Sequence, residues 1–108
     1  MANTFKNYFL KNATTTAANV YVAPAATQAT IIGMTIGNTS LSPISANVTV
    51  VSGGTTYFML QGATISNGGA LVPIGGDQKL VMEAGDYMQV QTSVVNSADV
   101  IVSVLEIA

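Results

Sequence analysis

The sequence predicts an all-β protein: a single jelly-roll-like antiparallel β-sandwich of about eight strands. Residues with a branched Cβ, which pack well on a pleated sheet, are abundant, with 13 Val, 8 Ile and 13 Thr against 6 Leu. Short apolar or alternating segments are separated by turn signals at the spacing typical of sandwiches. No window shows the sustained 3.6-residue apolar period of a long helix. An immunoglobulin-like sandwich is the alternative, because strand count alone does not determine strand order.

The first expected strands are separated by Pro- and Asn-containing segments. Residues 19–22 read as a strand that Ala23-Pro24 stops, and residues 30–38 read as the next strand. Gly33 and Gly37 lie inside this second strand, where glycine indicates a bulge or a close backbone approach. The 108 residues suffice for one core, so we expect residues 1–108 to form one domain.

The later strands are bounded mainly by glycine-containing turns. Residues 45–51 alternate between apolar and polar side chains, as in a strand with one buried face. Gly53-Gly54 predicts a tight hairpin turn into residues 55–60, because glycine tolerates the positive φ angles of such turns. Four further strands are expected at residues 70–74, 78–82, 87–93 and 99–107.

Four absent residue types exclude much chemistry. The chain has no Arg, His, Cys or Trp. Without Cys and His it lacks the usual ligand sets for zinc, copper, haem and iron–sulfur clusters. Without His it also lacks the usual general base and the standard nucleophile triads. We therefore expect no enzymatic activity, no catalytic residues, no cofactor and no metal.

The low charge favours a protein that works in an assembly. The net charge is −2 and only three Lys are present, so nucleic-acid binding is not expected. The apolar runs are far shorter than the roughly 20 residues of a membrane helix, and the start has no signal-peptide pattern. Charged residues make up 7% of the chain, against about a quarter in ordinary soluble domains. This composition suits packing against other copies, although an acidic soluble domain with a hydroxyl-rich exterior is the alternative.

Aromatic residues are concentrated near the N-terminus. Phe5, Tyr8 and Phe9 are three of the seven aromatics in the chain. One interpretation of residues 1–11 is an arm that anchors on a neighbouring subunit. The other is a first core strand with Phe5 and Phe9 directed inward. Both interpretations make the segment ordered within the particle, and Phe5, Tyr8 and Phe9 are the candidate interaction residues.

The last expected strand is apolar on nearly both faces. A strand of this kind is buried on both sides, either as a central core strand or because one face meets another subunit. Since side chains alternate along a strand, Val102 and Ser103 are expected to point to opposite faces. Ser103 is the candidate contact residue of the second face.

One acidic cluster, formed by Asp77, Glu83 and Asp86, has several interpretations. Carboxylates in loops can bind Ca²⁺, and a suitably spaced pair can hydrolyse glycosides. The spacing does not match an EF-hand loop, and no aromatic platform or basic partner accompanies the cluster. We favour a role in turn geometry, in which Asp bonds to its own backbone.

Several segments resemble small virion structural proteins of tailed bacteriophages. They are Met1-Ala2-Asn3-Thr4-Phe5-Lys6-Asn7, Tyr21-Val22-Ala23-Pro24-Ala25, Glu83-Ala84-Gly85-Asp86-Tyr87-Met88-Gln89-Val90 and Ala98-Asp99-Val100-Ile101-Val102-Ser103-Val104-Leu105-Glu106-Ile107. The resemblance extends over most of the chain, and its motifs are turn-and-strand patterns. Proteins of this kind include capsid decoration (cement) proteins, which clamp neighbouring major capsid proteins, and components of tails, baseplates and fibres. The resemblance supplies no catalytic motif.

The resemblance implies a non-enzymatic structural protein of a phage particle, with a capsid decoration protein as the specific expectation. Its partners would be the major capsid protein or other virion proteins, and further copies of itself in a homo-oligomer. It would be synthesised in the host cytoplasm and located in the virion. A tail, baseplate or fibre component is the first alternative, and a carbohydrate-binding β-sandwich module is a further one.

Overall fold

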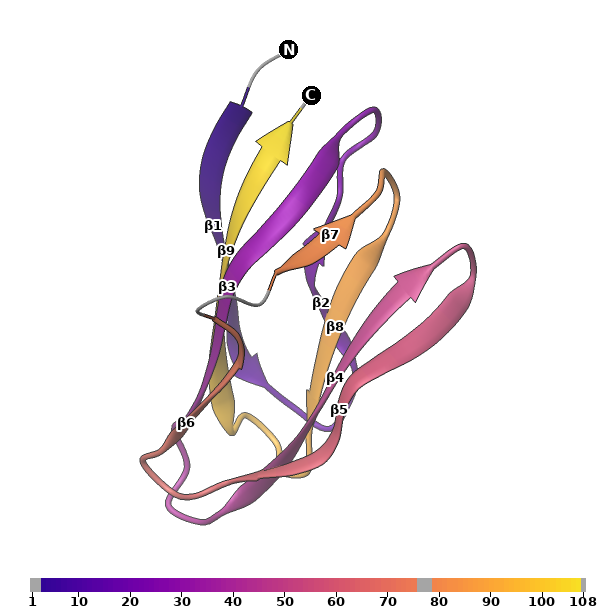
Figure 1. The fold of residues 1–108 in the computed structure, drawn as a ribbon. Coiled ribbons are helices and arrows are strands. Elements are labelled where there is room, and N and C mark those ends of the chain that lie inside the picture. Colours follow the sequence, from indigo (N-terminus) through magenta and orange to yellow (C-terminus); the bar gives the residue numbers. More distant parts are fainter. Residues whose placement is uncertain (1–2, 76–78, 108) are drawn as a thin grey trace.

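The computed structural model describes residues 3–75 and 79–107, which form two antiparallel sheets packed face to face (Figure 1). The prediction of an all-β sandwich is confirmed, with nine strands in place of about eight. The additional strand is formed by the N-terminal segment of the chain. The strands are β1 (Asn3–Ala13), β2 (Ala18–Val22), β3 (Gln28–Asn38), β4 (Ile44–Ser52), β5 (Thr55–Ile65), β6 (Ala70–Ile74), β7 (Leu80–Met82), β8 (Tyr87–Thr92) and β9 (Ala98–Ile107).

The strand order brings the two ends of the chain together. The first sheet has the order β1-β9-β3-β6, and β7 also pairs with β3. The second sheet has the order β2-β8-β4-β5. The first and last strands pair from Asn3 opposite Ile107 to Leu10 opposite Val100, and Figure 1 shows them side by side. β1 is therefore an edge strand, and β9 lies between β1 and β3.

Most strand positions agree with the sequence prediction. β6 has the predicted bounds, and β2, β3, β4, β8 and β9 differ from theirs by at most two residues at either end. β5 runs five residues further than expected, to Ile65. β7 begins at Leu80; the expected start at Gln78, and the Gly76 and Asp77 of the turn before it, lie outside the described residues.

The turn predicted at Gly53-Gly54 and the bulge predicted at Gly33 are present, whereas Gly37 lies in regular pairing. Gly53 and Gly54 form the turn between β4 and β5 with φ angles of 59° and 81°, the region that side chains disfavour. The pairing of β3 with β9 shifts register between Ile31 and Gly33, which places a bulge at the first glycine of β3. Gly37 instead pairs regularly with Asp99, so the bulge suggested there is absent from this pairing.

The core lies between the sheets and follows the two-residue alternation of the strands. In β9, the side chains of Val100, Val102 and Val104 are buried, whereas Ile101 and Ser103 face outward. The opposite orientation of Val102 and Ser103 is thus confirmed. The described residues include no helix long and apolar enough to cross a membrane.

The alternation in β9 predicts opposite effects for neighbouring substitutions. Val102 is 0% exposed, so Val102→Asp buries an unpaired carboxylate, whose cost of several kcal/mol is comparable to the whole stability of a small domain. We expect this variant to be unfolded. Ile101 is 46% exposed, so the control Ile101→Asp should stay folded, as measured by circular dichroism and urea denaturation. Equal urea midpoints for both variants would contradict the observed orientation.

Candidate functional site

The N-terminal aromatics lie on an edge strand of the sandwich itself. β1 pairs with β9 along most of its length. From Asn3 onward, the N-terminal segment is therefore a strand of the sandwich, as one of the two interpretations of residues 1–11 expected, and not a separate arm. The inward orientation of Phe5 and Phe9 is wrong: they are 72% and 69% exposed. Tyr8 and Leu10, at the alternate positions, pack against the core.

Cross-strand pairs continue this exposed surface over β9. Phe5 lies opposite Leu105, and Phe9 lies opposite Ile101. Between these two apolar pairs, Ser103 donates a hydrogen bond from Oγ to Asn7 Oδ1 at 2.7 Å. Phe5, Phe9, Ile101, Ser103 and Leu105 are called the outer apolar face below.

The outer apolar face reaches the opposite edge of the first sheet. Leu105 pairs with Thr30 of β3, and Thr30 pairs with Val81 of β7, which is exposed. Directly opposite side chains in a sheet are close enough to interact. A row of opposite side chains thus runs from Phe5 through Leu105 and Thr30 to Val81, on the side of the sheet that faces away from the core, and three of its four members are apolar.

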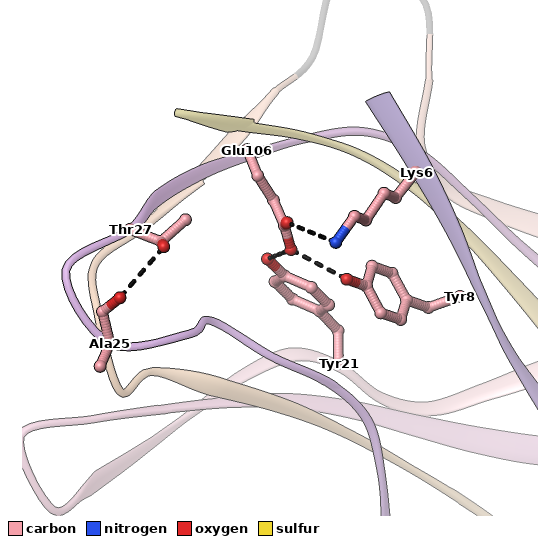
Figure 2. A network of polar contacts seen from close by, with 6 residues as sticks. All are labelled: Lys6, Tyr8, Tyr21, Ala25, Thr27 and Glu106. Carbon is pink, nitrogen blue, oxygen red and sulfur yellow. Dashed lines mark hydrogen bonds and ion pairs between the residues drawn. The ribbon is translucent and has the colours of Figure 1, made fainter. Parts of the chain in front are cut away.

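Behind this face, a buried carboxylate joins three strands (Figure 2). Glu106 of β9 is 6% exposed and faces the interior. Its Oε2 accepts hydrogen bonds from the hydroxyl groups of Tyr8, at 2.9 Å, and Tyr21, at 2.7 Å. Its Oε1 lies 3.3 Å from Lys6 Nζ in an ion pair. The rings of Tyr8 and Tyr21 are tilted by 60° with centroids 4.7 Å apart, an arrangement that aromatic pairs favour.

These donors hold Glu106 in its charged form. The hydrogen bond from Tyr21 lowers the pKa of the Glu106 carboxyl below its ordinary value, and Tyr8 and Lys6 add to the effect against the opposing cost of burial. Burial and the hydrogen bond to Glu106 raise the pKa of both Tyr8 and Tyr21. Around neutral pH the group therefore consists of one carboxylate and two neutral phenols, which suits a structural role.

The network gives Tyr8 a structural role within the sandwich. Its hydroxyl is held by Glu106, and its ring packs beside Tyr21. Tyr8 instead fixes the orientation of β1, so that Phe5 and Phe9, on the opposite face of the strand, point outward. Tyr8 thus positions the candidate site and does not form its surface.

The predicted acidic cluster is only partly described. Asp77 lies outside the described residues. Asp86 Oδ2 accepts a hydrogen bond from the backbone N–H of Glu83 at 3.0 Å, and the backbone N–H of Asp86 donates to the Glu83 carbonyl oxygen. This is the turn geometry that the sequence favoured. Residues 3–75 and 79–107 contain no group of three or more His, Cys, Asp or Glu side chains placed to hold a metal ion.

No site role was predicted from the sequence for Glu106, Tyr21 or Lys6. The sequence did contain a signal for Glu106. Its side chain points to the same buried face of β9 as those of Val102 and Val104. A charged residue at such a position needs polar partners. No local pattern indicates that these partners come from β1 and β2, which are distant in sequence.

Comparisons with known proteins address the fold. No protein-family model matches the sequence, and no curated protein sequence matches it. A similar solved structure is that of a protein of Bacillus endospore appendages, described as a novel family of disulfide-linked pili. It is 13% identical with a TM-score of 0.55, over 97% of this chain and 84% of that chain. At this identity the likeness shows a shared β-sandwich fold.

The Glu106 network predicts a specific loss of stability in acid. Because the pKa of Glu106 is lowered by folding, its contribution is complete above the ordinary carboxyl range of about 4.3 and is lost as pH falls through the folded-state value. Glu106→Gln leaves a buried donor or acceptor unpaired, so it should lower the free energy of unfolding at pH 7 by about 1–3 kcal/mol. The decrease in the free energy of unfolding between pH 7 and pH 3 should also be smaller in this variant than in the wild type, as measured by urea denaturation at each pH.

The control for this prediction is Asp99→Asn. Asp99 forms an exposed ion pair with Lys11 at 3.0 Å. Its loss should cost at most about 1 kcal/mol, as is usual for surface pairs. Wild-type stability and wild-type acid dependence in Glu106→Gln would contradict the structural role of the network.

Proposed function

We propose that this protein is a non-enzymatic structural subunit that assembles through its outer apolar face. The observation that carries the proposal is the pair of largely exposed phenylalanines, Phe5 and Phe9, on a strand that the Glu106 network holds in place. Contiguous exposed apolar residues mark interaction sites. Because the strand is ordered in advance, docking does not incur the entropy cost of ordering a free arm.

The more specific proposal is a capsid decoration protein of a tailed bacteriophage. The segments that resemble phage virion proteins support it, and so does a charged fraction of 7%. The major capsid protein, or another virion protein, is then the partner, and the virion is the location. Many copies, each bound by a modest apolar contact, stabilise a shell by mass action and oppose its expansion. We also expect contacts between copies of this chain.

The strand order supports a jelly-roll assignment within the sandwich class. β6 and β7 both pair with β3, so they correspond to one interrupted strand. The described part of the chain then has eight strands in the orders β1-β9-β3-β6/β7 and β2-β8-β4-β5. Viral capsid domains are among the proteins that use eight-stranded jelly rolls.

A tail, baseplate or fibre component is the alternative, because the same face serves any of these positions. The fold also occurs in a protein of disulfide-linked pili. This chain contains no Cys, so disulfide links cannot join its copies. Imaging of particles that carry the protein separates the possibilities: copies spread over the shell support a decoration protein, and copies confined to the tail support the alternative.

The docking face is tested with purified variants added back to particles that lack the protein. Phe5→Ser combined with Phe9→Ser should fold normally, because both side chains are exposed, but its occupancy should fall by at least about tenfold. Wild-type occupancy should persist in about 1 M NaCl, which screens exposed charges but not apolar contacts. It should decrease in modest urea, which solvates apolar and peptide groups.

Phe58 supplies the matched control, since it is exposed in β5 of the second sheet. Phe58→Ser should occupy particles like the wild type. Full occupancy of the Phe5/Phe9 double variant would place the contact on another face. Release of the wild type by salt alone would indicate an electrostatic interface. Either result would reject the outer apolar face as the docking surface.

A further inference from the structure

The second sheet has a shallow hollow on its outer side. The hollow has a volume of about 180 Å³ and is lined by residues of β4, β5 and β8, among them Asn47, Thr49, Phe58, Gln89 and Gln91. Sites for drug-sized ligands are larger, at about 300–1,000 Å³. A space of this size suits one ring-sized group, and the open sheet around it leaves room for a longer molecule to continue.

Strand register places three of its side chains, Gln89, Thr49 and Phe58, in one row. Gln89 of β8 lies opposite Asn19 of β2 and opposite Thr49 of β4. Thr49 in turn lies opposite Phe58 of β5. With neighbouring strands about 4.8 Å apart, the row from Asn19 to Phe58 spans roughly 14 Å across the sheet.

The amide side chains in the hollow are already oriented by hydrogen bonds. Gln91 Nε2 donates to the Thr15 carbonyl oxygen at 2.6 Å, and Asn47 Oδ1 accepts from the backbone N–H of Gly62 at 2.7 Å. These backbone partners determine which atom of each amide is oxygen and which is nitrogen. Gly62 reaches this position with a φ of 68°, which glycine adopts without strain.

Each oriented amide keeps a second polar atom for a ligand. Gln89 Nε2 donates to Asn19 Oδ1 at 2.9 Å. Within residues 3–75 and 79–107, Gln89 Oε1, Gln91 Oε1 and Asn47 Nδ2 have no hydrogen-bond partner. Gln91 therefore presents an acceptor and Asn47 a donor, while Gln89 is held by Asn19 and keeps one polar atom of its amide free, so binding costs little side-chain entropy.

The chemistry of the hollow matches a neutral sugar. Among the described residues that line it, none is charged, so it offers no counter-ion to a phosphate or carboxylate. Sugar hydroxyl groups both donate and accept hydrogen bonds, as the free amide atoms require. The ring of Phe58 is 54% exposed and presents an apolar surface for the C–H face of a sugar ring.

We propose that the outer side of the β2-β8-β4-β5 sheet binds a neutral oligosaccharide. Phe58 packs against one sugar ring, and Gln89, Gln91 and Asn47 bind its hydroxyl groups. This site is separate from the outer apolar face, because the two sheets pack together and their outer sides point in opposite directions. It therefore does not depend on the proposed assembly role.

The experiment is a titration of the ¹⁵N-labelled protein followed by NMR. The probes are six neutral hexasaccharides: cellohexaose, maltohexaose, laminarihexaose, xylohexaose, mannohexaose and chitohexaose. At least one should shift the signals of Thr49, Phe58 and Gln89, with a dissociation constant of about 1 mM or lower. Binding should be unchanged in about 1 M NaCl, because no ion pair contributes to it.

Two variants test the assigned residues. Phe58→Leu keeps apolar bulk on the strand but removes the aromatic face, and Gln89→Ala removes the amide that Asn19 holds in place. Each should weaken binding by about tenfold or more while the spectrum stays dispersed. Phe9→Leu, on the other sheet, is the matched control and should bind like the wild type.

The proposal is overturned if none of the six probes shifts these signals at about 10 mM, well above the expected dissociation constant. It is also overturned if Phe58→Leu and Gln89→Ala bind as the wild type does, since the sugar would then lie elsewhere. Particle occupancy of the Phe5/Phe9 double variant is measured separately, so failure of the sugar site is distinguishable from failure of the assembly face.

Discussion

The carboxylate of Glu106 is the constraint on which the arrangement of the first sheet depends. A charged group buried between two sheets is tolerated only when its oxygens are paired, and here two tyrosine hydroxyls and one ammonium group pair them. The partners come from β1 and β2, so one side chain joins three strands and both sheets. A shift of β1 by one residue would turn Tyr8 away from Glu106 and direct Phe9 toward the core. The exposure of the two phenylalanines is thus a consequence of a contact on the opposite side of their strand.

Much of the fold could be predicted from local sequence, because alternation and turn residues act over short distances. The orientation of Ser103 followed from its position beside Val102, and the Gly53-Gly54 turn followed from the backbone freedom of glycine. The orientation of β1 could not be predicted in this way. Its large side chains occupy both parities, with Phe5 and Phe9 on one face and Tyr8 and Leu10 on the other. The contact that decides between these faces joins residues 98 positions apart in the sequence.

The two outer sides of the sandwich differ in how they interact with water. The side formed by β1, β9 and β3 exposes Phe5, Phe9 and Ile101 beside two polar pairs, Asn7 with Ser103 and Lys11 with Asp99. The side formed by β2, β8 and β4 carries amides and hydroxyls, which hydrogen-bond with water without contributing charge. The low charge of the chain therefore affects the two outer sides differently. The amide-rich side can remain solvated, whereas the apolar side gains most by being covered.

This asymmetry also determines which surface a subunit would leave exposed once it is bound to a partner. When two sheets pack face to face, the outer side of one lies a full sandwich thickness away from the outer side of the other. A copy that covers Phe5 and Phe9 against a partner leaves Gln89 and Phe58 directed away from that partner. The two surfaces then need no shared residue and no conformational change to act at the same time. The core lies between them, and Glu106 and the buried valines of β9 hold it in one register.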